Sequence, residues 1–175
     1  MLETLISSKT RIKLLLKFFL NAQAKGYLRS LEQEFGESTN AIRLELNKFE
    51  EAGMLSSEQE GNKKVFSANR KHPLFDNLHH LVMKYVGLDR IVDNITERLG
   101  EVEAVYLVGD YAEGRDSGII DLFVLAPQLN IEYLINLLAK AEEEIERKIR
   151  YVHFKTQFEI QKLLDQQSHL LIWEA

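Results

Sequence analysis

The first half of the chain shows hydrophobic residues at the spacing of amphipathic helices. One helix is predicted to follow the capping residues Ser7 and Ser8 and to end before Gly26, with an apolar stripe at Ile12, Leu15, Leu16 and Phe19. A short helix is predicted from Ser30, as its cap, to Phe35. A third helix is predicted to begin at Ser38 or Thr39 and to end before Gly53, with an apolar stripe at Ile42, Leu46 and Phe49.

Two short apolar stretches after these helices predict a β-hairpin. Its strands contain Leu55 and Phe66, and its basic tip consists of Lys63 and Lys64. Two further helices are then expected. The first has Pro73 in its first turn and an apolar stripe at Leu74, Leu78, Leu81, Val82 and Tyr85. The second follows Gly87 and carries Leu88, Ile91, Val92, Ile95 and Leu99.

The pattern in the second half of the chain changes to buried strands alternating with helices. Strands are predicted over residues 105–108, 119–125, 149–154 and 170–173, with a polar loop over 109–118 and a helix over 131–146. Thr156 and Glu159 form the sequence pattern of a capping box for a last short helix. The chain is therefore predicted to be an α+β protein with an N-terminal domain over 1–72, connecting helices over 73–100 and a small α/β domain over 101–175.

Composition and charge narrow the class of protein. The chain has 175 residues, 45% of them hydrophobic, with no Cys, which excludes disulfides and thiolate zinc sites. No stretch is apolar enough to span a membrane, so a cytoplasmic location is expected. Residues 1–72 contain 12 Lys and Arg against 9 Asp and Glu, whereas residues 73–175 contain 10 against 18. Local positive charge attracts phosphates, so nucleic acid stays a candidate partner of the first half.

The third predicted helix carries short polar and basic side chains opposite its apolar stripe. A helix that reads the major groove of DNA needs such residues near its N-terminus, and the candidates are Ser38, Thr39, Asn40, Arg43 and Asn47. Arg43 is the best candidate base reader, and the tip residues Lys63 and Lys64 suit contacts with phosphates. The alternative interpretation is a solvated helix face beside an ordinary polar turn.

The order helix, helix, turn, helix, hairpin in residues 1–72 resembles the winged helix-turn-helix domains of ArsR-like and MarR-like regulators. The resemblance covers "YLRSLEQEFGESTNAIRLELNKFEEAGMLSSEQEGNKKVFSANRKHPLF". It implies a transcriptional regulator that binds double-stranded DNA as a homodimer, with the apolar helices of 73–99 as the candidate interface. Metal sensing is not expected, because the chain has no Cys and His72, His79 and His80 form no His-x3-His pair on one helix face.

A second pattern, "VYLVGDYAEGRDSGIIDLFVLA", places a Gly-bearing loop between two strands, the second of which carries an acidic residue. It resembles the signature of the nucleotidyltransferase superfamily, in which a Gly-Ser loop holds nucleotide phosphates and carboxylates hold Mg²⁺. Position by position, Gly109 matches the family glycine, Asp110 replaces the serine, Ile119 replaces the first metal-binding Asp and Asp121 matches the second. The third carboxylate is missing from 149–154. The resemblance therefore implies an inactive domain with no cofactor.

Three interpretations of this loop stay open. Asp110, Asp116 and Ser117 could serve only as loop formers and caps, with Asp121 held by backbone donors. Alternatively, the loop retains a site for a nucleotide or small-anion effector, with Gly109, Asp110, Ser117 and Asp121 as the candidate ligand-binding residues. The third interpretation is an active minimal nucleotidyltransferase that uses Mg²⁺ and a nucleoside triphosphate, with Asp110, Asp116 and Asp121 as a rearranged carboxylate set and the N-terminal domain as a partner-binding module.

Overall fold

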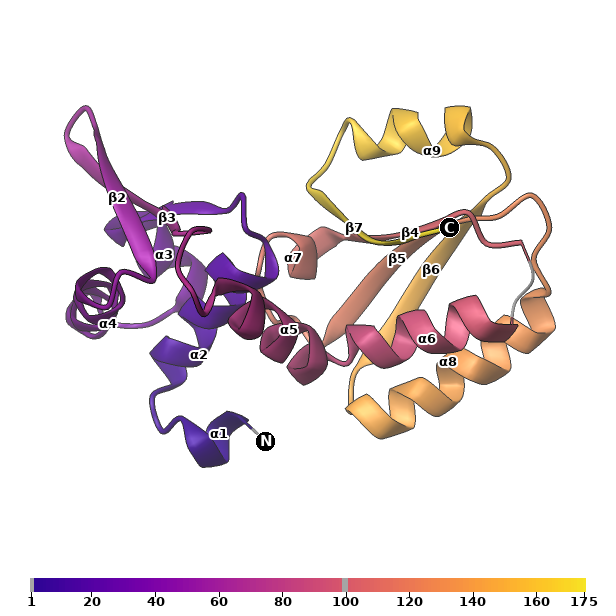
Figure 1. The fold of residues 1–175 in the computed structure, drawn as a ribbon, viewed down its shortest axis with the longest axis horizontal. Helices are drawn as coiled ribbons and strands as arrows, with labels where there is room; N and C mark the ends of the chain where they lie inside the picture. Colours follow the sequence, from indigo (N-terminus) through magenta and orange to yellow (C-terminus); the bar gives the residue numbers. More distant parts are fainter. Residues whose placement is uncertain (1, 99–100) are drawn as a thin grey trace. The chain divides into compact units, whose positions relative to one another are not determined.

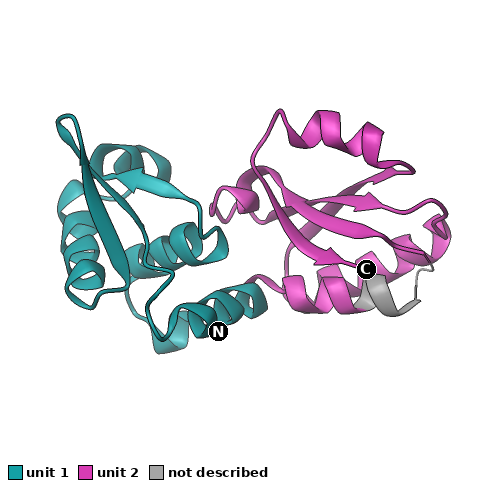
Figure 2. Cartoon of the chain, turned by 45° about the horizontal axis from the view of Figure 1, so that its top comes forward, with its two compact units in different colours: residues 1–85 teal, residues 86–175 magenta. Residues whose placement is uncertain are grey.

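A computed structural model describes residues 2–98 and 101–175, without the side chains of 94–98. The predicted apolar positions Ile95 and Leu99 therefore lie outside the described part of the chain. The chain divides into two compact units, residues 1–85 and 86–175 (Figure 2). This division falls inside the predicted connecting segment 73–100, and the three-part domain assignment stays a prediction.

Unit 1 begins with helices that the hydrophobic pattern largely predicts. Its first four helical segments are α1 (Leu2–Leu5), α2 (Lys9–Leu15), η1 (Leu16–Leu20) and α3 (Leu28–Phe35), and α4 (Thr39–Glu51) follows. Ser8 caps α2, because its side chain accepts a hydrogen bond from the Arg11 N–H. Segment η1 is a turn of π-helix, and all its residues are buried, including Lys17, which forms an ion pair with Glu34 at 2.9 Å.

The prediction that Ser30 is the N-cap of α3 is wrong. The helix begins at Leu28 with Tyr27 as its N-cap, and Ser30 lies in the first turn, where its Oγ accepts a hydrogen bond from the Tyr27 N–H. A short strand, β1 (Lys25–Tyr27), leads directly into the helix and moves its start upstream. The end of α4 is as predicted, since Gly53 follows it with a φ of +71°.

The three-stranded antiparallel sheet of unit 1 has the order β1-β3-β2. Strands β2 (Leu55–Glu60) and β3 (Lys63–Ala68) form the predicted hairpin, in which Glu60 pairs with Lys63 next to the turn. Strand β1 pairs with the other edge of β3, and Tyr27 lies opposite Val65. This pairing brings the start of α3 next to the hairpin, which the sequence pattern does not reveal.

Helix α5 (Phe75–Val86) begins two residues after Pro73, so Pro73 precedes the helix rather than lying in its first turn. The Phe75 ring packs on Phe19 with 5.8 Å between the centroids, and a ring nitrogen of His79 lies 2.7 Å from the Phe19 carbonyl oxygen. Phe75 and Val82 are buried. These apolar side chains therefore serve the core of the chain itself, and the homodimer stays a prediction.

Unit 2 contains a four-stranded sheet with the order β6-β5-β4-β7. The strands are β4 (Ala104–Val108), β5 (Ile119–Leu125), β6 (Lys148–Phe154) and β7 (His169–Glu174). Strand β4 pairs antiparallel with β5 and β7, whereas β5 and β6 are parallel and are connected through α8 (Ile131–Ile145). Both α8 and α6 (Leu88–Arg98) lie on one face of this sheet, and α9 (Gln157–Leu164) lies on the other (Figure 1).

The core of unit 2 follows the alternation of side chains along its strands. Phe123 and Phe154 pack with Ile160 and Leu164 of α9, whereas Ile120, Leu122 and Val124 are buried with the opposite orientation. Thr156 and Glu159 form the predicted capping box at the start of α9. The segment 109–112, predicted as loop, forms the short helix α7 (Gly109–Ala112).

Candidate functional site

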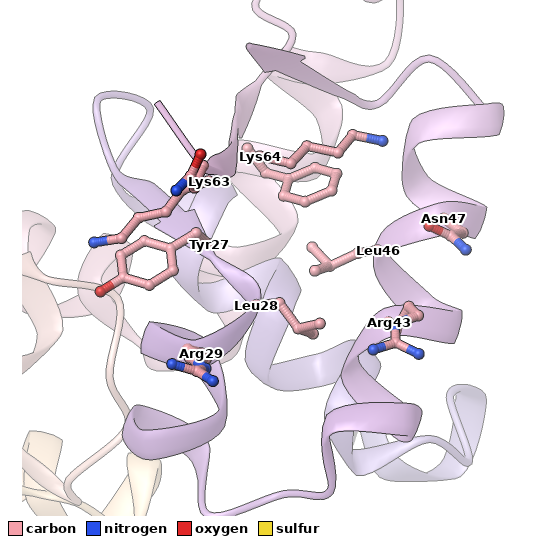
Figure 3. A pocket seen from close by; sticks show the side chains of 10 residues that line it. Tyr27, Leu28, Arg29, Arg43, Leu46, Asn47, Lys63 and Lys64 are labelled. Carbon is pink, nitrogen blue, oxygen red and sulfur yellow. The ribbon is translucent and has the colours of Figure 1, made fainter. Parts of the chain in front are cut away.

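A groove of about 540 Å³ lies in unit 1 between α4, the start of α3 and the β2–β3 hairpin (Figure 3). Arg43 and Asn47 project from α4, and Lys63 and Lys64 belong to the hairpin. These four side chains are among the predicted DNA-binding residues, and the structure brings them to one surface. Leu28, Leu46 and Phe66 add apolar side chains between them.

The other three predicted DNA-binding residues lie at the start of α4, outside the lining of this groove. Ser38 is the N-cap of the helix and its Oγ accepts a hydrogen bond from the Ala41 N–H at 3.2 Å. Thr39 is half-buried and Asn40 is exposed in the first turn. Ser38 therefore fixes the beginning of α4, and Asn40 is accessible on its surface.

Sequence reasoning missed the residues that β1 and α3 contribute to the groove. Tyr27, Leu28 and Arg29 line it because β1 pairs with β3 and places the start of α3 beside the hairpin. The only local signal for this arrangement was the pattern Tyr27 to Ser30, in which Ser30 Oγ accepts a hydrogen bond from the Tyr27 N–H and donates one to the Tyr27 carbonyl oxygen. Arg29 thus adds a cation to the groove opposite the one from α4 (Figure 3).

The cations of the groove differ in their partners. Among the described residues, neither Arg29 nor Arg43 forms an ion pair, whereas Arg11 in the same unit binds Glu45 with two hydrogen bonds of 2.8 and 3.2 Å. The Lys63 ammonium lies 4.2 Å from the centroid of the Tyr27 ring, a cation–π contact (Figure 3). Positive charge is therefore accessible on both sides of the groove.

Lys64 differs from Lys63, because it is held by an acidic residue of α4. Its Nζ lies 2.6 Å from Glu50 Oε2, and Ser57 donates a hydrogen bond to the other carboxylate oxygen of Glu50. These hydrogen bonds from Lys64 and Ser57 lower the pKa of Glu50 below its ordinary value. Glu50 thus connects the C-terminal end of α4 to both strands of the hairpin.

The second candidate site lies in unit 2, where β4 ends and α7 begins. Gly109 has a φ of +68°, and a Cβ there would lie 3.0 Å from Asp121 Oδ2. The pKa of Asp110 lies below its ordinary value, chiefly because of the hydrogen bond from Arg115. Ser117 Oγ donates a hydrogen bond to the Ile119 carbonyl oxygen at 3.3 Å. The structure therefore brings the predicted residues Gly109 and Asp121 together.

Each aspartate of this region is matched with an arginine. Arg115 Nη2 lies 2.6 Å from Asp110, and Arg150 binds both carboxylate oxygens of Asp121 at 2.6 and 2.8 Å. Arg115 therefore compensates the negative charge that Asp110 places in the loop. Asp121 is held by the Arg150 side chain, and not by backbone donors of the loop as one interpretation expected.

Asp116 belongs to a third and more buried pair. Its carboxylate accepts hydrogen bonds from the Tyr111 hydroxyl and from Arg147 Nη2, the latter at 2.8 Å, while Arg147 Nε donates to the Tyr111 hydroxyl at 2.7 Å. Burial opposes ionisation of Asp116, but the hydrogen bonds from Arg147 and Tyr111 outweigh it, so the pKa of Asp116 lies below its ordinary value. Burial raises the pKa of the Tyr111 hydroxyl. This network fastens the loop to the start of β6.

The strand on which the resemblance places a third carboxylate carries an arginine beside Asp121. Strand β6 runs parallel to β5, and the residue in register with Asp121 is Arg150. Arg150 therefore places a positive charge beside Asp121, which disfavours the binding of a divalent cation by this carboxylate. Among the described residues, no three side chains of His, Cys, Asp or Glu converge in a way that could hold a metal ion.

No protein-family profile matches the chain, and no curated protein matches it either. Several solved structures are similar to about half of it. One is a mutant of the toxin–antitoxin MntA-HpeT, with 18% identity and a TM-score of 0.40 over 50% of this chain and 72% of that one. Another comes from Shewanella oneidensis, with 18% identity and a TM-score of 0.40 over 53% and 72% of the two chains. A third is AF1382 from Archaeoglobus fulgidus, with 17% identity and a TM-score of 0.38 over 55% and 99%.

The two sites have different chemical capacities. The groove of unit 1 offers guanidinium, ammonium and amide groups around apolar side chains, a combination suited to an extended polyanion. The loop of unit 2 has its carboxylates neutralised by guanidinium groups, which disfavours the clamping of a divalent cation. In the described part of the chain, no helix is both long and apolar enough to cross a bilayer.

Proposed function

We propose that the protein is a transcriptional regulator that binds double-stranded DNA through unit 1. In this proposal residues 1–72 form a winged helix-turn-helix domain, with α4 as the reading helix and the β2–β3 hairpin as the wing. The observation that carries it is the groove in which Arg29, Arg43, Asn47 and Lys63 surround an apolar floor (Figure 3). A helix in the major groove reads bases from its exposed side chains, while neighbouring cations hold phosphates.

The positions of Arg43 and Asn47 support the role of α4. They lie one helical turn apart, are exposed and project to the same side of the helix. An arginine can donate two hydrogen bonds to a guanine, and an asparagine can bind an adenine in the same way. Because Arg43 has no carboxylate partner among the described residues, contact with DNA requires no ion pair to be broken first.

The contacts around the hairpin support its role as the wing. Glu50 holds the hairpin against α4, and Lys63 lies over Tyr27 at the opposite side of the groove. A lysine near a phosphate releases condensed counterions and adds affinity without base preference. The tip therefore suits contact with the DNA backbone beside the bases that α4 reads.

For unit 2 we propose a nucleotidyltransferase-like domain, over residues 101–175, that does not transfer nucleotides. The pairing of Asp110, Asp116 and Asp121 with arginines supports the absence of nucleotide transfer. A metal-dependent transfer reaction needs carboxylates that are free to clamp Mg²⁺ on the reacting phosphoryl group. Regulation through a small-anion effector at this loop, and assembly into a homodimer, belong to the same proposal.

Selection from a random duplex library tests the function of unit 1. The full chain, its Arg43→Ala variant and a Lys9→Ala control are each used to enrich duplexes, and affinities are measured by fluorescence anisotropy at several salt concentrations. We expect Arg43→Ala to reduce discrimination between the enriched duplex and random DNA by about 1 to 3 kcal/mol. Lys9 is exposed on α2 and lies outside the lining of the groove, so its loss leaves discrimination unchanged.

A second arm of this experiment separates base reading from backbone contact. Lys63→Ala should weaken the binding of all duplexes alike and reduce the salt slope by about 1. Equal loss of specific and random binding in Arg43→Ala would contradict its role as a base reader. If the wild-type chain enriches no sequence, the proposed function is wrong.

A further inference from the structure

The exposed face of α4 contains one large apolar side chain, Leu44, which is 52% exposed. Asn40 lies one turn before it, and Asn47 and Lys48 lie one turn after it on the same face. Arg43 is its neighbour in sequence, and all four of these polar residues are exposed. Leu44 is thus an apolar group in the middle of the surface that, under the proposed function, faces the bases.

A single exposed leucine is ordinary on a protein surface, so its exposure alone decides nothing. Its position distinguishes it from the other large apolar side chains exposed in the described part of unit 1. Leu5 is the last residue of α1, and Leu74 precedes α5, whereas Leu44 lies in the interior of α4. The helix buries Ile42, Leu46 and Phe49 on its other face, so Leu44 contributes nothing to that core.

The charge around Leu44 indicates what kind of partner covers it. Arg43 and Lys48 flank it with positive charge, of which Lys48 also lies 3.6 Å from the buried Glu45 carboxylate. Glu51, an exposed acidic residue of the same face, lies two turns farther along the helix. A second copy of the chain would bring like charges together at this position, which opposes contact. A polyanion that offers small apolar groups fits both features, and the major groove of DNA offers the methyl group of thymine.

We infer that Leu44 is a specificity-determining residue that contacts the 5-methyl group of a thymine in the major groove. This inference rests on the proposed function of unit 1 and adds an apolar reader to the polar ones, Arg43 and Asn47. Thymine is the base that carries a methyl group in this groove, so an apolar contact there distinguishes it from cytosine and from uracil.

The test uses the full chain and the duplex that it enriches most strongly from a random library. Each thymine of that duplex is replaced in turn by deoxyuridine, which lacks only the methyl group, and affinities are measured by fluorescence anisotropy. We expect one of these single replacements to weaken wild-type binding about fourfold, as burial of one methyl group implies. If the protein binds as a dimer, the equivalent thymine of the other half of the duplex should give the same effect. The Leu44→Ala variant should bind both duplexes equally well at that position.

Ile135→Ala is the matched control, because Ile135 is an aliphatic residue that is 54% exposed on α8 of unit 2. It should keep the full wild-type response to deoxyuridine. A thermal melt of Leu44→Ala verifies that the fold is intact, as expected for an exposed position with good helix propensity.

The outcomes separate this inference from the function on which it rests. The role of Leu44 is overturned if the enriched duplex contains no thymine. It is also overturned if wild type and Leu44→Ala respond equally to deoxyuridine. Either result leaves the DNA-binding function standing. Loss of self-association in Leu44→Ala, measured by sedimentation, would assign the residue to contact between copies and also overturn the inference. If no duplex is enriched by the wild-type chain, both proposals are wrong.

Discussion

The arginines in the groove of unit 1 and those around the loop of unit 2 differ in their partners. In the groove of unit 1, Arg29 and Arg43 form no ion pair among the described residues. In unit 2, Arg115, Arg147 and Arg150 are each bound to an aspartate at 2.6 to 2.8 Å. A paired guanidinium already has its charge and some of its donors compensated by a carboxylate, whereas an unpaired one offers its full charge and all its donors to a phosphate. The contrast shows that the net charge of a unit does not reveal which of its cations are already paired with carboxylates.

The largest effect is expected for the most buried of the pairs in unit 2. The Arg147 side chain is 13% exposed and bonds to both Asp116 and Tyr111. Arg147→Ala removes the cation that compensates the partly buried Asp116 carboxylate and one hydrogen bond to the Tyr111 hydroxyl. Tyr111 still donates to Asp116, but the carboxylate loses its countercharge, so we expect the variant to destabilise unit 2 by about 2 to 3 kcal/mol. Urea denaturation followed by the fluorescence of Trp173, the single tryptophan of the chain, measures this change.

Arg115→Ala is the control for this measurement, because Arg115 is 40% exposed and its pairs with Asp110 and Glu113 lie at the surface. Such pairs contribute about 0 to 1 kcal/mol. If both variants lost the same stability, the distinction between the buried network and the surface pairs would be wrong.

An intermediate effect is expected from releasing Lys64 in unit 1. Glu50 binds Lys64 at 2.6 Å, so phosphate and carboxylate compete for the same ammonium group. Glu50→Gln should therefore raise the affinity for random duplex about three- to fivefold and steepen the salt slope by about 1. Glu51→Gln removes the same formal charge from a neighbour on α4 and should have a smaller effect.

The same substitution in a Lys64→Ala background makes this prediction specific. Without the ammonium group, Glu50→Gln should no longer change the salt slope. A slope that changes equally in both backgrounds would show that Glu50 acts through general repulsion of DNA and not through Lys64.

The smallest effect is expected for the pair that occupies the register position of a third carboxylate. Arg150 is 67% exposed, although it binds Asp121 with two hydrogen bonds. Arg150→Ala should leave the stability of unit 2 nearly unchanged, because an ion pair at the surface contributes little. The same urea denaturation measures it, and a loss as large as that of Arg147→Ala would remove the difference between the two pairs.

Much of the fold could be predicted from local pattern. The spacing of Ile42, Leu46 and Phe49 identifies α4, and Ser38 and Gly53 mark its ends as observed. The tip of the hairpin was recognisable from its turn residues. These features depend on neighbours within a few positions along the chain, so their signals are present in a single sequence.

The parts that were missed depend on residues far apart in the sequence. Strand β1 has three residues, and it exists because it pairs with β3, about forty positions later along the chain. Without that pairing, nothing places Arg29 beside Lys63. The partner of Asp121 was hidden for the same reason, since only the parallel register of β5 and β6 puts Arg150 beside it.

The position of β6 at the edge of its sheet has a consequence for solubility. An open edge offers unpaired N–H and C=O groups to any other strand, and charged side chains on an edge strand hinder such addition. Lys148 and Arg150 supply these charges on β6, ahead of the exposed Val152. Arg150 thus places a charge on the open edge of the sheet, which hinders the addition of a strand from another copy.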